Sequence, residues 1–116
     1  METKVKKNRI SEKQIKKLQN NLQMNRTLLG YYFWTELIKE ALKINLITEI
    51  VISDLEEKVA KSFNTTFQRV CRGLRTSIDS LGEKQIQEYF NVKYKITIKS
   101  MLFLCLDYLK TNYLKN

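Results

Sequence analysis

The stretch "VAKSFNTTFQRVCRGLRTSID", residues 59–79, decides the fold that the sequence predicts. Asn64 tolerates a left-handed backbone almost as well as glycine does, so it indicates the end of a helix. Thr65 or Thr66 can then cap the next helix at its N-terminus. Ala60 is small at the point where two helices would approach each other closely. The stretch therefore predicts two helices joined by a short turn.

The second of these helices, expected at about residues 66–80, has two distinct faces. Its apolar side chains recur every four residues and face the core: Val70, Leu74 and Ile78. The other face carries Gln68, Arg72 and Arg75, and Cys71 adjoins it. The helix therefore has a core face and a second, guanidinium-bearing face that is free for another purpose. A solvated basic surface without a ligand is the alternative interpretation of that second face.

The guanidinium-bearing face has the chemistry that reads DNA. In a helix–turn–helix unit, the N-terminal part of the second helix enters the major groove. The planar fork of arginine matches the O6 and N7 acceptors of guanine, glutamine can pair with adenine, and threonines with helix N–H groups suit a phosphate. The candidate base-reading residues are Arg72, Arg75, Gln68 and Cys71. The candidate phosphate-binding residues are Thr65, Thr66, Arg69 and Lys61.

The rest of the chain predicts an all-α fold, a compact bundle of about six helices. There is no proline and there are only three glycines in 116 residues, so helix breakers are few. Helices are expected at about residues 12–24, 28–45, 53–62, 66–80, 83–90 and 98–113. Residues 46–52 and 91–98 are β-branched enough to allow strands, but neither has an evident partner, so we interpret them as connections. The last helix is apolar on nearly all sides, which places it centrally in the core or under a partner chain.

The domain organisation follows from these elements. We expect a flexible basic arm at residues 1–10 and one helical DNA-binding domain at 11–116, with the helix–turn–helix at about 54–80. Ser11 and Gln14 form a plausible capping box at the start of the first helix.

The net charge of +9 is distributed unevenly along the chain. Lysine and arginine outnumber acidic residues by eight to two in residues 1–26 and by four to one in 61–80, whereas acidic residues lead by six to three in 27–60. Basic surplus in patches suits a polyanion, most often nucleic acid, although a lysine-rich surface that serves only solubility is the alternative. Non-specific affinity for DNA is expected from Lys4, Lys6, Lys7 and Arg9.

Several other function classes are disfavoured by composition. The chain has no histidine, so the usual proton shuttle is missing, and we expect no enzyme, no cofactor and no metal site. Cys71 beside Arg72 could be a thiol of lowered pKa, but no base accompanies it; redox sensing is the milder alternative for Cys71. The N-terminus has no apolar signal-peptide region and the longest apolar run, residues 101–106, is too short for a membrane span. A soluble, cytoplasmic protein is expected.

The stretch "VAKSFNTTFQRVCRGLR" resembles the C-terminal effector domain of the sporulation initiation factor, the master response regulator of endospore formation in Firmicutes. The resemblance extends back to "GYYFWTELIKEAL" and forward to "TIKSMLFLCLDYL", whereas residues 83–96 match loosely. It implies an all-helical domain with a helix–turn–helix, sequence-specific binding of duplex DNA at a box resembling TGTCGAA, and transcriptional control. It also implies that Arg72 and Arg75 belong to the recognition helix and that Arg72 reads guanine.

Two departures from the family bear on this interpretation. Cys71 stands where the family usually has an acidic residue, and a thiol neither accepts from cytosine N4 nor holds arginines as a carboxylate does, so the preferred box is expected to differ or to be relaxed. The sequence also has no stretch long enough for the family's receiver domain, so we expect an effector domain without it.

The expected partner is double-stranded DNA. A homodimer is also expected, formed through the last or the first helix, on paired DNA boxes. The rival hypothesis is a helical adaptor that binds another regulator or RNA polymerase without reading DNA, which the acidic middle of the chain allows. No membrane partner is expected.

Overall fold

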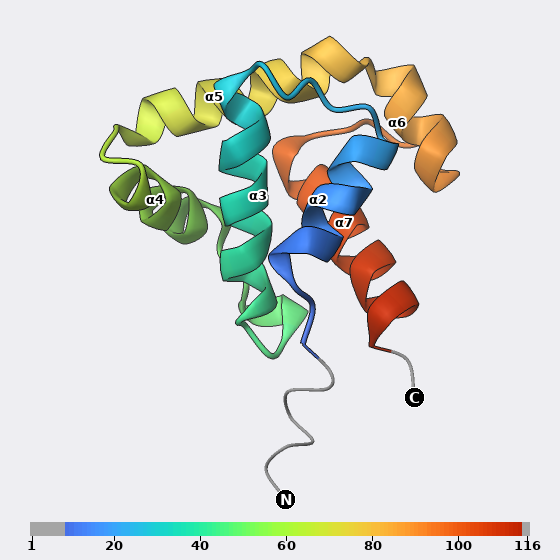
Figure 1. Ribbon diagram of the computed structural model, residues 1–116, viewed down its shortest axis with the longest axis horizontal. Helices are drawn as coiled ribbons and strands as arrows, with labels where there is room; N and C mark the ends of the chain where they lie inside the picture. The colour runs from blue at the N-terminus through green and yellow to red at the C-terminus, as the bar shows by residue number, and fades with distance from the viewer. Residues whose placement is uncertain (1–8, 115–116) are drawn as a thin grey trace, which may run out of the picture.

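The computed structural model describes residues 9–114, in which there are six α-helices, one short 3₁₀ helix and no strand (Figure 1). In chain order they are α2 (Glu12–Asn21), α3 (Leu29–Leu42), η1 (Ile47–Glu49), α4 (Ile52–Ser62), α5 (Phe67–Leu81), α6 (Glu83–Phe90) and α7 (Ile98–Tyr113). The predicted all-α class with about six helices is confirmed. Neither of the two β-branched segments forms a strand: one contains η1, and the other is an extended connection.

The helices are arranged around α3 and α5. Helix α5 runs along one edge of the molecule, and the N-terminal end of α3 meets it there (Figure 1). Helix α4 lies on one side of α3, while α2 and α7 lie on the other (Figure 1). The core forms between them, and the α3 side chains Trp34, Leu37 and Ile38 are fully buried in it.

Helix α7 buries its apolar residues within its own chain. The side chains that it places in the core are Met101, Leu102, Cys105, Leu106 and Leu109. Phe103 and Leu104 are half-buried and pack against the same core, whereas Asp107 is exposed. Of the two placements predicted for this helix, the structure therefore shows the one in the core of its own chain.

The helix ends follow local sequence signals, with one exception. Ser11 and Gln14 make the predicted capping box, and Thr97 caps α7. The helix expected at about residues 53–62 is the exception: its N-cap residue is Val51, which makes no side-chain hydrogen bond. The backbone N–H groups of Asp54 and Leu55 both donate to the carbonyl of Val51, so the helix begins one residue earlier than the polar residues indicate.

Two glycines let α3 and α5 come into backbone contact. A Cβ atom added to Gly30 would lie 2.2 Å from the carbonyl oxygen of Gly73 and 2.2 Å from Oγ of Ser77. A Cβ atom on Gly73 would lie 2.7 Å from the ring of Phe33. Beside this contact, the indole N–H of Trp34 donates to the carbonyl oxygen of Leu74 at 3.1 Å. The position of α5 on the bundle therefore depends on the absence of two side chains.

We expect Gly30→Ala to lower the free energy of unfolding by about 2–3 kcal/mol, because the added methyl group meets backbone that cannot move aside. Helix propensity alone predicts the opposite sign, since alanine is better than glycine in a helix by about 1 kcal/mol. Gly73→Ala should cost less, because its added methyl group meets the side chain of Phe33 and not backbone. Denaturant unfolding checks both, with Ser80→Ala on the exposed side of α5 as the control. A Gly30→Ala protein as stable as the wild type would contradict the close approach.

Candidate nucleic-acid interface

The turn between α4 and α5 has the geometry that its sequence indicates. Asn64 adopts the left-handed conformation, with φ of 54°. Its N–H donates to the carbonyl of Lys61 at 3.2 Å, and the N–H of Thr65 donates to the carbonyl of Ala60 at 2.9 Å. This pair of hydrogen bonds is a Schellman motif, which satisfies the last carbonyls of α4 and redirects the chain. The arrangement of α4, turn and α5 is consistent with the predicted helix–turn–helix.

The start of α5 is capped by Thr66 and not by Thr65. Oγ1 of Thr66 accepts a hydrogen bond from the N–H of Arg69 at 3.2 Å. Thr66 is exposed and Thr65, which precedes it, is half-buried. The positive end of the helix dipole and these donors make the N-terminus of α5 suitable for a phosphate.

The outward face of α5 contains most of the predicted DNA-contacting side chains. Gln68, Arg69 and Arg72 are all exposed, and Lys61 is exposed near the end of α4. Within residues 9–114 the guanidinium of Arg72 makes no ion pair or hydrogen bond. Arg72 lies near the middle of this face, opposite the core-facing Leu74 and Ile78. Its five N–H donors are therefore available to a ligand.

The sequence predicts that Arg75 reads a base, but in the structure its guanidinium is already hydrogen-bonded within the protein. Its Nε donates to Oδ1 of Asp79 at 3.2 Å, one helical turn along α5. Its Nη1 donates to the carbonyl oxygen of Ile96 at 3.3 Å, in the connection between α6 and α7. Arg75 thus lies at the flank of the outward face and ties α5 to another part of the fold.

Cys71 lies against α4 and contacts a buried carboxyl. Glu56 is only 5% exposed, and its burial raises the pKa of this carboxyl above its usual value. Burial first, and then the neighbouring carboxylate of Glu56, raise the pKa of Cys71 to about 11. The alternative of a Cys71 thiol with a lowered pKa is therefore wrong, because the thiol is partly buried and its neighbour Glu56 is an acid.

Sequence reasoning missed the buried position of Glu56. The signal that could have corrected this is spacing: Glu56 precedes Ala60 by four residues and so shares the face that packs against α5.

The remaining predicted residues lie away from this face or outside the described range. Lys4, Lys6 and Lys7 fall outside residues 9–114, as does most of the expected N-terminal arm. Arg9 is exposed at the first described position. In the described range there is no cluster of potential metal ligands, and no helix there is long and apolar enough to cross a membrane.

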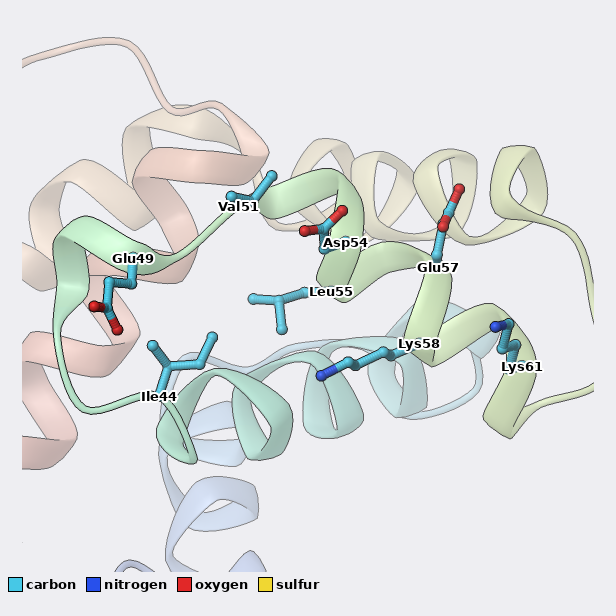
Figure 2. Close-up of a pocket in the computed structure, with 8 residues that line it drawn as sticks. All are labelled: Ile44, Glu49, Val51, Asp54, Leu55, Glu57, Lys58 and Lys61. Atoms are coloured by element: carbon cyan, nitrogen blue, oxygen red, sulfur yellow. The ribbon is translucent and has the colours of Figure 1, made fainter.

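A hollow lies on the outer side of α4 (Figure 2). Its lining combines apolar and charged side chains from α4 and the preceding connection: Ile44, Glu49, Val51, Asp54, Leu55, Glu57, Lys58 and Lys61. Three of its charged residues are acidic, so it does not suit a nucleic-acid backbone. The mixture of apolar and charged side chains suits a segment of a protein better.

Comparison with known families gives one match. The family model described as "Sporulation initiation factor Spo0A C terminal" matches residues 15–102. The match begins in α2, includes the whole of α3 to α6 and ends in the first turns of α7. No curated protein and no solved structure matches the chain.

The burial of Glu56 makes stability depend on pH. Because its pKa is raised in the folded state, the folded protein binds a proton more readily than the unfolded chain, and stability falls as pH rises past the unfolded value of 4.5. We therefore expect Glu56→Gln to unfold at a higher temperature than the wild type at pH 7, with the difference shrinking towards pH 4. The exposed neighbour Glu57→Gln is the control. Equal shifts for both variants at both pH values would contradict a special role for Glu56.

Proposed function

Since the chain belongs to the family of the sporulation initiation factor Spo0A C-terminal domain, whose members are DNA-binding effector domains, it is a DNA-binding regulator of transcription, and we propose that α5 reads a specific sequence in the major groove. The proposed site is a short box resembling TGTCGAA. Sequence-specific recognition in that groove depends on side chains that can reach base edges.

The observation that carries this proposal is that the guanidinium of Arg72 is exposed and has no bonding partner in residues 9–114. Its guanidinium is exposed on the outward face of α5 and makes no hydrogen bond or ion pair with residues 9–114. An arginine of this kind can donate two parallel hydrogen bonds to O6 and N7 of guanine. We assign this role to Arg72, with Gln68 beside it as an adenine or phosphate contact.

The neighbouring residues of α5 receive the other roles. Thr65, Thr66 and Arg69 lie at its N-terminal end and hold phosphates, and Lys61 assists them from α4. Arg75 can reach a base edge only by giving up its bond to Asp79, so we rank its contribution to base reading below that of Arg72.

Cys71 sets the sequence preference indirectly in this proposal. Because it lies against Glu56 and is a poor acceptor, it leaves the groove without the carboxylate that the family usually places there. Discrimination at the corresponding base pair is therefore expected to be weaker than in relatives that have an acidic residue.

A second function is favoured by a separate surface. Leu46, Ile47 and Val51 are 56%, 43% and 51% exposed in the connection before α4, and Val51 lines the hollow of Figure 2. Exposed apolar residues beside acidic ones suit a protein partner, such as another regulator or RNA polymerase. The two functions are distinguished by salt, because log K for a duplex falls with log salt by about 0.9 for each phosphate contact. A protein partner gives a shallower dependence and no base preference.

Homodimer formation on paired boxes remains part of the proposal. Because α7 buries most of its apolar residues in its own core, a large dimer contact through that helix alone is disfavoured, and two copies are expected to associate mainly on DNA. Light scattering with and without a two-box duplex tests this. A strict monomer in both conditions would remove the dimer.

We expect Arg72→Ala to weaken binding to the box by about 1–3 kcal/mol and to leave binding to a scrambled duplex nearly unchanged, because a base contact is lost. Fluorescence anisotropy on both duplexes at two salt concentrations measures this. Arg69→Ala is the matched control: as a phosphate contact, it should weaken binding to both duplexes alike. Wild-type protein that binds neither duplex would reject DNA reading, and an unchanged preference in the Arg72 variant would remove Arg72 from its role.

A further inference from the structure

We propose that the connection between α6 and α7, together with the first turn of α7, is a second DNA contact that binds backbone phosphates beside the bases that α5 reads. The residues that make this contact are Lys93, Lys95 and Lys99, with Tyr94 between the first two. We call this set the lysine flank. The inference rests on the proposed function, since it places a duplex against α5.

The connection has no regular secondary structure, yet it is held firmly on α5 and α6. Ile96 is fully buried, its N–H donates to Oε2 of Glu83 at 2.7 Å, and its carbonyl accepts from Arg75. Nε2 of Gln87 donates to the carbonyl of Tyr94 at 2.9 Å. These hydrogen bonds fix the backbone of residues 94–96 from both neighbouring helices. A contact surface that is fixed before binding loses little conformational entropy when a ligand arrives.

The side chains of the lysine flank are exposed, and no carboxylate in the described part of the chain neutralises them. The ammonium group of Lys99 lies 5.9 Å from the centre of the Phe103 ring. Lys93, Lys95 and Lys99 are exposed and make no ion pair with another residue in the described part of the chain. Tyr94 is 52% exposed. The nearby carboxylate of Glu83 is engaged by the N–H of Ile96, and that of Asp79 by Arg75.

The start of α7 adds to this positive charge. Its first turn contains Lys99 and no acidic residue, although a helix N-terminus carries partial positive charge and favours acidic side chains. A lysine placed here is repelled by the positive end of the helix dipole unless an anion is present. Compact ammonium groups of this kind bind phosphates as point charges.

Position relates the lysine flank to the duplex. The carbonyl of Ile96 accepts from Arg75, which lies at the edge of the outward face of α5. An α-helix with its side chains is about 10–12 Å across, and the major groove is about 12 Å wide, so a helix in the groove fills it from wall to wall. Whatever is attached to the flank of that helix then faces the wall of the groove, which is the sugar–phosphate backbone.

The test compares two double variants of the full chain. Lys93→Ala/Lys95→Ala removes two members of the lysine flank. Lys43→Ala/Lys110→Ala removes the same charge from the C-terminal ends of α3 and α7, which lie far from α5 (Figure 1). Fluorescence anisotropy is measured on a TGTCGAA-like box and on a scrambled duplex over a series of salt concentrations. Circular dichroism verifies that both variants keep the helical content of the wild type.

The first variant should bind both duplexes more weakly by the same factor, so that the ratio of the two affinities stays at the wild-type value. The slope of log K against log salt should fall by about 2, close to 0.9 for each lost phosphate contact. The control variant should keep the wild-type slope. This pattern distinguishes the lysine flank from Arg72, because loss of Arg72 changes the ratio of the affinities for the box and for the scrambled duplex.

Two outcomes would overturn the proposal. Equal loss of slope in both variants would show a general effect of net charge, and an unchanged slope in the first variant would show that its lysines do not meet the duplex. In either case a wild-type preference for the box would leave the proposed function intact. Conversely, a wild type without any preference, whose slope still falls in the first variant only, would reject sequence reading by α5 and retain the lysine flank.

Discussion

The close approach of Gly30 to Gly73 is the constraint on which the rest of the structure depends. With no side chain at either position, the backbone of α3 touches α5, and the indole of Trp34 can reach the carbonyl of Leu74. Because α5 is fixed at its middle in this way, its outward face keeps a constant position relative to the core. The exposed arginine of that side is therefore held by a buried contact about one helix diameter away. Rigid support of this kind is what a groove-reading helix needs.

Local signals allowed much of the fold to be predicted from the sequence. Asn64, Thr66 and Ser11 act on their own backbone neighbours, so their effects can be inferred without knowing the fold. The bond between Arg75 and Ile96 was not predictable, because it joins segments 21 residues apart whose meeting depends on how α6 packs. The role of the glycine pair was missed for the same reason. Sequence reasoning thus placed Gln68 and Arg72 together on one helix, whereas the partners of Arg75 depend on contacts between distant segments.

The contact between Glu56 and Cys71 shows how a recognition helix and its supporting helix are coupled. A second carboxylate at position 71 would face a buried acid, and two like charges in a poorly solvated place strongly disfavour each other. The thiol avoids that repulsion. The identity of the residue beside Arg72 is therefore tied to the interior of α4 as well as to the base it approaches.

The connection between α6 and α7 is held through main-chain atoms: the N–H and carbonyl of residue 96 and the carbonyl of residue 94. Side chains at positions 93 and 95 take no part in these bonds, so their identity can change while the path of the chain stays the same. The outward face of α5, which determines sequence preference, is a separate set of residues. Total affinity and sequence preference can thus vary independently during evolution, one by exchange of exposed charges and the other by exchange of groove-facing side chains.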